Sequence, residues 1–93
     1  MIMSFKSKET EKIWFGELSL KLPKEIQNIV RRKLRMINNS STLYDLRIPP
    51  SNHLESLKND RKGQYSIRIN DKWRICFKWI DNNCYDLEIV DYH

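Results

Sequence analysis

The fold is decided by the segment Gln64-Tyr65-Ser66-Ile67-Arg68-Ile69-Asn70-Asp71-Lys72-Trp73-Arg74-Ile75-Cys76-Phe77-Lys78-Trp79. Large apolar side chains occupy alternate positions before and after a short polar stretch, as in two strands that bury one face. A three-residue loop at 70–72 keeps both apolar sets on the same face, because a slip of one residue would turn one set outward. This register sets Arg68 opposite Arg74 on the polar face. The sequence therefore predicts an antiparallel hairpin.

The same period of two continues on both sides of this hairpin. A last strand follows the polar stretch Asp81-Asn82-Asn83, and a three-residue loop there pairs Ile75 with Ile89 and Lys78 with Asp86. The strands predicted from this pattern are 54–58, 64–70, 73–80 and 84–90.

The first half of the chain has helical spacing. Ser7 is a suitable N-cap for a helix over about 8–16, and Pro23 suits the first turn of a second helix. The apolar positions of the second helix are Ile26, Ile29, Val30, Leu34 and Ile37. They recur every three or four residues, as expected for one buried face.

A short strand at 2–6 precedes the helices, and a loop at 41–53, which has room for a helical turn, follows them. We therefore expect one α+β domain over residues 1–93, with two N-terminal helices packed on one face of a mainly antiparallel sheet.

The net charge of +5 is concentrated in the first half of the chain. Its centre is Arg31-Arg32-Lys33 with Arg35, which helical spacing places opposite the apolar stripe. Such a cluster attracts nucleic acid or an acidic protein partner, and it is equally typical of a solvated helix face.

Several function classes lack their sequence signals. No apolar run approaches the roughly 20 residues that span a bilayer, and the start does not resemble a signal peptide, so we expect a cytoplasmic protein. Cys76 and Cys84 are expected to be reduced strand residues. The cysteines and histidines lack metal-ligand spacing, and glycine-rich nucleotide loops are missing. We expect no metal and no cofactor.

The remaining chemistry is acid–base cleavage of RNA, which carries its own nucleophile in the 2′-OH group. The chain closes with Asp91-Tyr92-His93, a carboxylate, a phenol and an imidazole directly after the last predicted strand. Such groups can exchange protons with the attacking and leaving oxygens. The basic candidates for phosphate binding are Lys58, Arg61, Arg68 and Arg74.

The pairing of Arg68 with Arg74 has two interpretations. Like charges directly opposite each other on a sheet repel. Either the nearby Glu88 offsets this repulsion, or the two guanidinium groups bind a phosphate.

Two stretches resemble a known family. Leu54-Glu55-Ser56-Leu57-Lys58-Asn59-Asp60-Arg61-Lys62-Gly63-Gln64-Tyr65-Ser66-Ile67-Arg68-Ile69-Asn70-Asp71-Lys72-Trp73-Arg74-Ile75 and the closing Glu88-Ile89-Val90-Asp91-Tyr92-His93 are similar to the HigB toxins. These toxins, also called plasmid-maintenance killer proteins, belong to the RelE/ParE superfamily of bacterial toxin–antitoxin systems.

The resemblance implies a RelE-like, microbial-RNase-type fold and an endoribonuclease that cuts mRNA in the ribosomal A site without a metal. It implies a HigA-type helix-turn-helix antitoxin as partner, besides the 70S ribosome and mRNA, and contact with operator DNA only through the antitoxin complex. The family's catalytic residues correspond to Lys58, Asp91, Tyr92 and His93, and a recurrent arginine corresponds to Arg74.

Two positions depart from the family pattern. Asn59 replaces the glycine of the motif Leu-Lys-Gly-Asp, and Glu55 stands where some members have a catalytic histidine. His53 lies two residues further upstream, which favours a loop role over catalysis. ParE-like relatives bind DNA gyrase without cutting RNA and provide the alternative function. The closing acid–base trio favours the nuclease.

Overall fold

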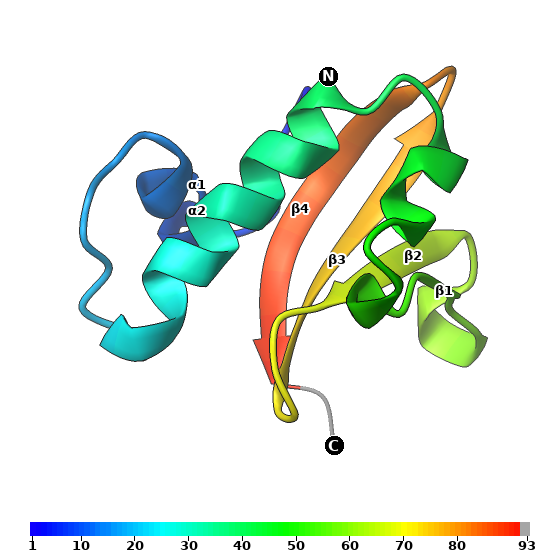
Figure 1. Cartoon of the computed structure of the whole chain (residues 1–93). Coiled ribbons are helices and arrows are strands. Elements are labelled where there is room, and N and C mark those ends of the chain that lie inside the picture. The colour runs from blue at the N-terminus through cyan, green and yellow to red at the C-terminus, as the bar shows by residue number, and fades with distance from the viewer. Residues whose placement is uncertain (92–93) are drawn as a thin grey trace.

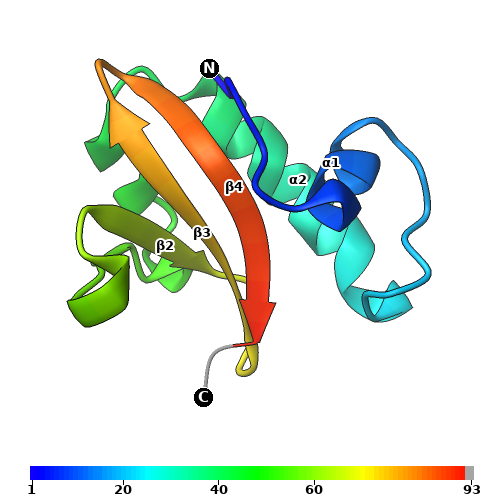
Figure 2. The ribbon, with the colours of Figure 1, turned by 180° about the vertical axis from the view of Figure 1, so that it is seen from behind.

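The protein, in a computed structural model that describes residues 1–91, is an antiparallel sheet with helices on one face. Figure 1 shows α2 lying across the sheet, and Figure 2 shows the opposite sheet face uncovered by either α-helix. The strand order is β1-β2-β3-β4. The α-helices are α1 (Lys8–Trp14) and α2 (Lys24–Asn39), the 3₁₀ segments are η1 (Leu43–Arg47), η2 (Pro50–Asn52) and η3 (Asn59–Arg61), and the strands are β1 (Glu55–Ser56), β2 (Gln64–Arg68), β3 (Trp73–Ile80) and β4 (Asn83–Asp91).

The helices begin where the sequence predicts. The Thr10 amide donates to Ser7 Oγ at 3.3 Å, which confirms Ser7 as the N-cap of α1. Pro23 directly precedes α2, where its fixed φ suits a helix start. The helix predicted over about 8–16 ends earlier, because Gly16 has a φ of 85° and terminates it.

The core lies between α2 and the helix-facing side of the sheet. Four of the five predicted apolar positions of α2 are fully or almost fully buried, and Ile29 is half-buried. They pack against inward-facing residues of the strands, among them Ile67, Ile75, Phe77 and Leu87. Burial of this apolar face is the main reason that α2 is stable in its place.

The β2–β3 hairpin confirms the predicted register. Ile67 pairs with Ile75, and Arg68 pairs with Arg74. The Ile69 amide donates to the Trp73 carbonyl at 2.9 Å, so the loop contains the expected three residues.

The β3–β4 hairpin corrects a prediction. Ile75 pairs with Ile89 as expected, but Lys78 pairs with Tyr85 instead of the predicted Asp86, and the turn has two residues instead of three. Asp81 and Asn82 both have positive φ, which suits a tight two-residue turn. A β-bulge with Asp86 at a φ of 54° then inserts one extra residue. The bulge restores the apolar register that a two-residue turn alone would break.

The strands predicted at 54–58 and 2–6 are shorter than expected. β1 contains two residues rather than the predicted 54–58. The segment 2–6 forms two isolated parallel bridges to β4, at Ile2 and Phe5, instead of a full strand. Its Ser4 Oγ accepts from the Asp86 amide at 2.9 Å, so the bulge also anchors this segment.

Lys33 is not on the basic helix face on which the sequence analysis placed it with Arg31, Arg32 and Arg35. It is buried, and its Nζ donates to Asn52 Oδ1 at 2.6 Å. Position 33 follows Ile26 by seven residues and Val30 by three, which is the spacing of the buried stripe. The predicted loop at 41–53 contains η1 and η2, and the Lys33–Asn52 hydrogen bond anchors it to α2. Within residues 1–91, neither α-helix has the length and apolar character required to cross a membrane.

Candidate active site

The helix-free face of the sheet carries one row of side chains across all four strands. The register pairs Glu55 with Ser66, Ser66 with Cys76, and Cys76 with Glu88. Ser66 and Cys76, in the middle of the row, are small and fully buried. The row therefore has a low centre with a carboxylate at each end, and we call Ser66 and Cys76 the floor of the site.

Arg74 lies on one side of this floor. Its Nε donates to Ser66 Oγ at 2.8 Å, and one Nη donates to the His53 carbonyl at 2.6 Å. The other Nη lies 3.9 Å from Glu55 Oε1. Arg74 is only 8% exposed. These contacts hold the guanidinium group in one orientation beside the floor.

Arg61 lies on the other side. One Nη lies 3.5 Å from Glu88 Oε1, and the other donates to Gln64 Oε1 at 3.1 Å. Glu88 Oε2 lies 3.3 Å from Lys6 Nζ. The carboxylate of Glu88 is thus shared by two cations, Arg61 and Lys6. One interpretation of the Arg68–Arg74 pair was that Glu88 offsets the repulsion between the two arginines. In the structure, the Glu88 carboxylate instead pairs with Arg61 and Lys6.

Lys58 is joined to Arg61 through the backbone of η3. The Arg61 amide donates to the Lys58 carbonyl at 3.2 Å, and the Lys58 side chain is exposed. Asn59 has a φ of 58°. This left-handed conformation is one that glycine and asparagine adopt more readily than other residues. The structure therefore explains how asparagine can stand where the family motif has glycine.

The other predicted residues of the described part of the chain lie outside the floor. Arg68 forms an ion pair with Asp71 in the β2–β3 loop. Asp91, at the end of β4, is paired with Trp73, so strand alternation places it on the helix-facing side of the sheet and not on the face that carries the floor. Its carboxylate forms an ion pair with Lys72 at 3.5 Å. Tyr92 and His93 lie outside the described residues. His53 is exposed, with a φ of 44°, and the contact that links it to Arg74 is made by its backbone carbonyl.

The two cysteines are buried thiols. Burial raises the pKa of Cys84 to about 12. Burial also raises the pKa of Cys76, although the nearby charge of Arg61 opposes this. Both side chains are therefore protonated near neutral pH and poor nucleophiles. Within residues 1–91, no group of three or more His, Cys, Asp or Glu side chains is placed to hold a metal ion.

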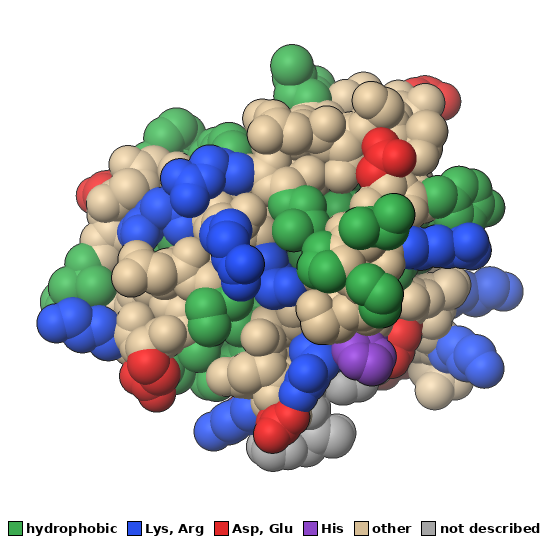
Figure 3. All heavy atoms as spheres, in the orientation of Figure 1, with side chains coloured by type: hydrophobic (Ala, Val, Ile, Leu, Met, Phe, Trp, Pro, Cys, Tyr) green, Lys and Arg blue, Asp and Glu red, His purple; other side chains and the backbone are tan. Residues whose placement is uncertain are grey.

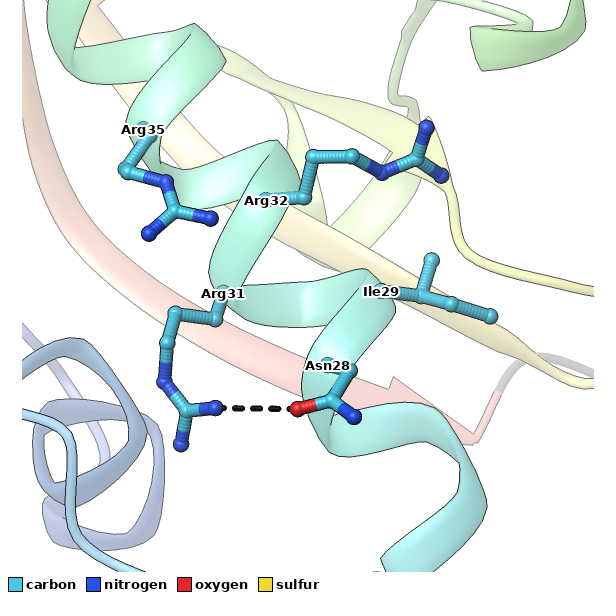
Figure 4. A pocket seen from close by; sticks show the side chains of 5 residues that line it. All are labelled: Asn28, Ile29, Arg31, Arg32 and Arg35. Atoms are coloured by element: carbon cyan, nitrogen blue, oxygen red, sulfur yellow. Dashed lines mark hydrogen bonds between the residues drawn. The ribbon is translucent and has the colours of Figure 1, made fainter.

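An open hollow of about 550 Å³ lies on α2, away from the floor. Figure 3 shows Lys and Arg side chains gathered over this face of the molecule. In Figure 4, Arg31 and Arg35 point to one side of α2, and Arg32 and Ile29 point to the other. We call Arg31, Arg32 and Arg35 the α2 arginines. The hollow is lined by these arginines, Asn28 and Ile29, which suits anion binding but supplies no acid–base pair. The sheet face is therefore the candidate active site.

Sequence reasoning selected Arg61 and Arg74 but missed the floor between them. Ser66 and Cys76 carry no charge, so no motif identifies them. The signal that could have found them is register, because both alternate with buried apolar residues on the strands that carry the arginines.

Sequence similarity to known proteins covers nearly the whole chain. The family model described as "RelE-like toxin of type II toxin-antitoxin system HigB" matches residues 3–93. Toxin HigB-1 of Vibrio cholerae serotype O1 (strain ATCC 39315 / El Tor Inaba N16961) is 38% identical over 82 residues, which cover 87% of this chain and 86% of that protein. Endoribonuclease HigB of Proteus vulgaris is 30% identical over the full length of both proteins.

Solved structures share the fold at lower identity. YafQ from E. coli strain BL21(DE3) aligns with a TM-score of 0.65 and 15% identity, over 98% of this chain and 91% of YafQ. One chain of the heterotetrameric YoeB–YefM toxin–antitoxin complex from Staphylococcus aureus aligns with a TM-score of 0.60 and 21% identity, over 100% of this chain and 95% of that one. The α+β fold is therefore that of known toxins, and the resemblance seen in the sequence is confirmed. The chain belongs to the HigB family of RelE-like toxins from type II toxin–antitoxin systems.

Proposed function

We propose that this toxin is a ribosome-dependent endoribonuclease that cuts mRNA in the A site and so inhibits translation. Its likeness to Endoribonuclease HigB over the full length of both chains supports the reaction class. Because the reaction takes place on translating ribosomes, the protein would act in the cytoplasm.

The observation that carries this proposal is the placement of Arg61 and Arg74 on either side of the floor formed by Ser66 and Cys76. A backbone phosphate above the floor would face a guanidinium group on each side. Guanidinium groups bind phosphate oxygens in a planar fork and stabilise the charge that develops on them during cleavage. Lys58 and Arg68 would add charge at the border of this site.

We assign the proton transfers to the last three residues of the chain. The 2′-OH of the substrate is the nucleophile, one group of the site removes its proton, and another protonates the leaving 5′-oxygen. Asp91, Tyr92 and His93 supply suitable groups, and imidazole can act as base or acid near neutral pH. In this mechanism the chain needs neither metal nor cofactor.

The partners follow from the family and from the second basic surface. A HigA-type helix-turn-helix antitoxin would neutralise the toxin, and operator DNA would be contacted only through that complex. The YoeB–YefM complexes, in which a related fold is bound to its antitoxin, support a protein partner of this kind. We assign the α2 arginines to phosphates of ribosomal RNA, since the hollow between them can admit a nucleic-acid backbone.

The test is to map 5′ ends on an mRNA in a purified translation reaction, with wild-type protein and with His93→Ala. Cuts within codons that require ribosomes and disappear in the variant are the expected result. Lys78→Ala provides the control, since Lys78 pairs with Asp86 at 3.4 Å, away from the floor. Intact mRNA with the wild-type protein would reject the proposal. A gyrase supercoiling assay would then examine the ParE-like alternative.

A further inference from the structure

Glu88 is a charged side chain of the sheet face that no assigned role uses. It belongs to β4, and its side chain is only 16% exposed. Oε1 faces Arg61 at 3.5 Å and Oε2 faces Lys6 at 3.3 Å. Within the described residues, Oε2 is buried and has no hydrogen-bond partner. The carboxylate is therefore held by charge from two sides and is incompletely hydrogen-bonded.

Stability alone is a poor explanation for this arrangement. An ion pair with a solvent-exposed cation generally contributes little to stability, because solvent screens the attraction, and Lys6 and Arg61 are 59% and 32% exposed. A buried oxygen without a hydrogen bond carries a further cost. An apolar residue between Cys76 and Lys6 would cover the sheet at lower cost. What Glu88 does supply is a fixed negative charge that determines where the Arg61 guanidinium lies.

The position of Arg61 requires such a partner. Arg61 belongs to η3, between β1 and β2, and Glu88 lies on β4 at the other side of the sheet. The Arg61 guanidinium therefore reaches a residue of β4 on the sheet face that carries Cys76, the register partner of Glu88. Gln64 Oε1 fixes the second Nη at 3.1 Å.

We infer that Glu88 is a positioning residue, which holds Arg61 across the floor so that its guanidinium faces the substrate phosphate opposite Arg74. This inference rests on the proposed nuclease function. In it, Glu88 contacts no substrate atom and exchanges no proton. Its charge also weakens RNA binding in the ground state, because it neutralises part of Arg61 and Lys6. Glu88 thus lowers the affinity of the site for RNA while it fixes the orientation of Arg61.

This role has a kinetic signature that a purely structural residue would not produce. Glu88→Gln keeps the shape of the side chain but removes its charge. Arg61 then has more freedom, and kcat should fall about tenfold to a hundredfold, as expected for a displaced group at a reacting centre. KM for RNA should stay equal or decrease, because two cations lose their internal counter-charge. The salt dependence of single-stranded RNA binding should steepen by about 0.7 in log–log slope for each additional phosphate that the protein neutralises.

The experiment compares wild type, Glu88→Gln, Arg61→Ala and the double variant in ribosome-dependent cleavage. Asp86→Asn is the matched control, since it removes one carboxylate of β4 and an ion pair with Lys78. We expect the double variant to match Arg61→Ala in kcat, and the control to match wild type. If Glu88→Gln lowers kcat by the same factor with and without Arg61, the positioning role is wrong.

A readout without catalysis separates this inference from the proposed function. The guanidinium NH resonances of Arg61 should be resolved and slow to exchange in the NMR spectrum of the wild type, and should be averaged in Glu88→Gln. If the wild type cuts no RNA, the proposed function is wrong, but these resonances still test whether Glu88 positions Arg61. Unchanged Arg61 resonances in Glu88→Gln would overturn the inference whatever the activity.

Discussion

At the scale of single residues, the arginines of this toxin differ in how firmly they are held. Arg74 is buried and bonded to Ser66 and to the His53 carbonyl, whereas Arg68 contacts the exposed Asp71. Rigid donors are more effective in catalysis, because they need no reorganisation when charge develops. Arg74 should therefore contribute more to the reaction than its neighbour on β2.

This difference predicts the result of a substitution pair on β3. Arg74→Lys keeps the charge but loses the planar fork, and kcat/KM should fall about a hundredfold, as for the loss of one preorganised donor. Lys78→Ala, on the same strand, should stay close to wild type. Cleavage rates in the translation reaction measure both, and a thermal unfolding scan checks that both variants are folded. Equal losses would contradict the assignment of Arg74 to the site.

The cysteines allow a second prediction at this scale. Burial raises the pKa of Cys84 to about 12 and also raises that of Cys76. Native protein at pH 8 should therefore react very slowly with a disulfide reagent, while both thiols should react at once in denaturant. Spectrophotometric thiol titration measures the reactive thiols in each state. Rapid labelling of either thiol in the native state would show that the structure opens around that cysteine.

At the scale of elements, the sequence predicted what periodicity controls and failed where local geometry intervenes. The β2–β3 pairing was predictable because both strands bury one apolar face. The β3–β4 turn was not, since a left-handed residue in a bulge, here Asp86, can absorb one residue without altering the apolar pattern. The floor of the site was missed for a related reason, because small buried residues carry no chemical signal of their own.

The burial of Lys33 in α2 leads to a stability prediction. Its Nζ donates to Asn52 Oδ1 at 2.6 Å, and Asn52 is fully buried. Lys33→Met should lower the free energy of unfolding by about 1–3 kcal/mol, because it leaves this buried oxygen unsatisfied. Lys24→Met, at an exposed position of the same helix, should have little effect. Urea unfolding of the variants at pH 7 measures the difference.

The same lysine predicts a pH dependence. Burial lowers the pKa of Lys33 below its ordinary 10.5, and the charges of Arg32 and Arg68 lower it further. Between the folded and unfolded pKa values the unfolded chain binds more protons, so stability rises with pH in that interval. The difference in stability between wild type and Lys33→Met should therefore increase as the pH rises towards the ordinary lysine pKa of 10.5. A constant gap would mean that Lys33 keeps an ordinary pKa.

At the scale of the whole molecule, the positive charge is divided between two surfaces. The sheet face combines Arg61 and Arg74 with the carboxylates of Glu55 and Glu88, so its charge is nearly balanced. The α2 arginines line an open hollow, in which Arg31 donates to Asn28 Oδ1 at 3.1 Å. The net charge of +5 therefore acts mainly through the helices. One surface is suited to orient a phosphate, and the other to attract a polyanion.

This division predicts that substitutions can change the affinity for the ribosome without changing the rate of RNA cleavage. Replacing Arg31, Arg32 and Arg35 by glutamine should weaken ribosome binding and reduce its salt dependence, because fewer counterions are released. The cleavage rate of ribosome-bound toxin at saturation should stay near wild type, since the sheet face is intact. Replacing Lys8, Lys21 and Lys24 by glutamine removes the same charge from exposed positions outside the hollow and provides the control. If both triple variants weaken binding equally, the attraction comes from net charge alone. If only the arginine variant does, α2 is a specific docking surface.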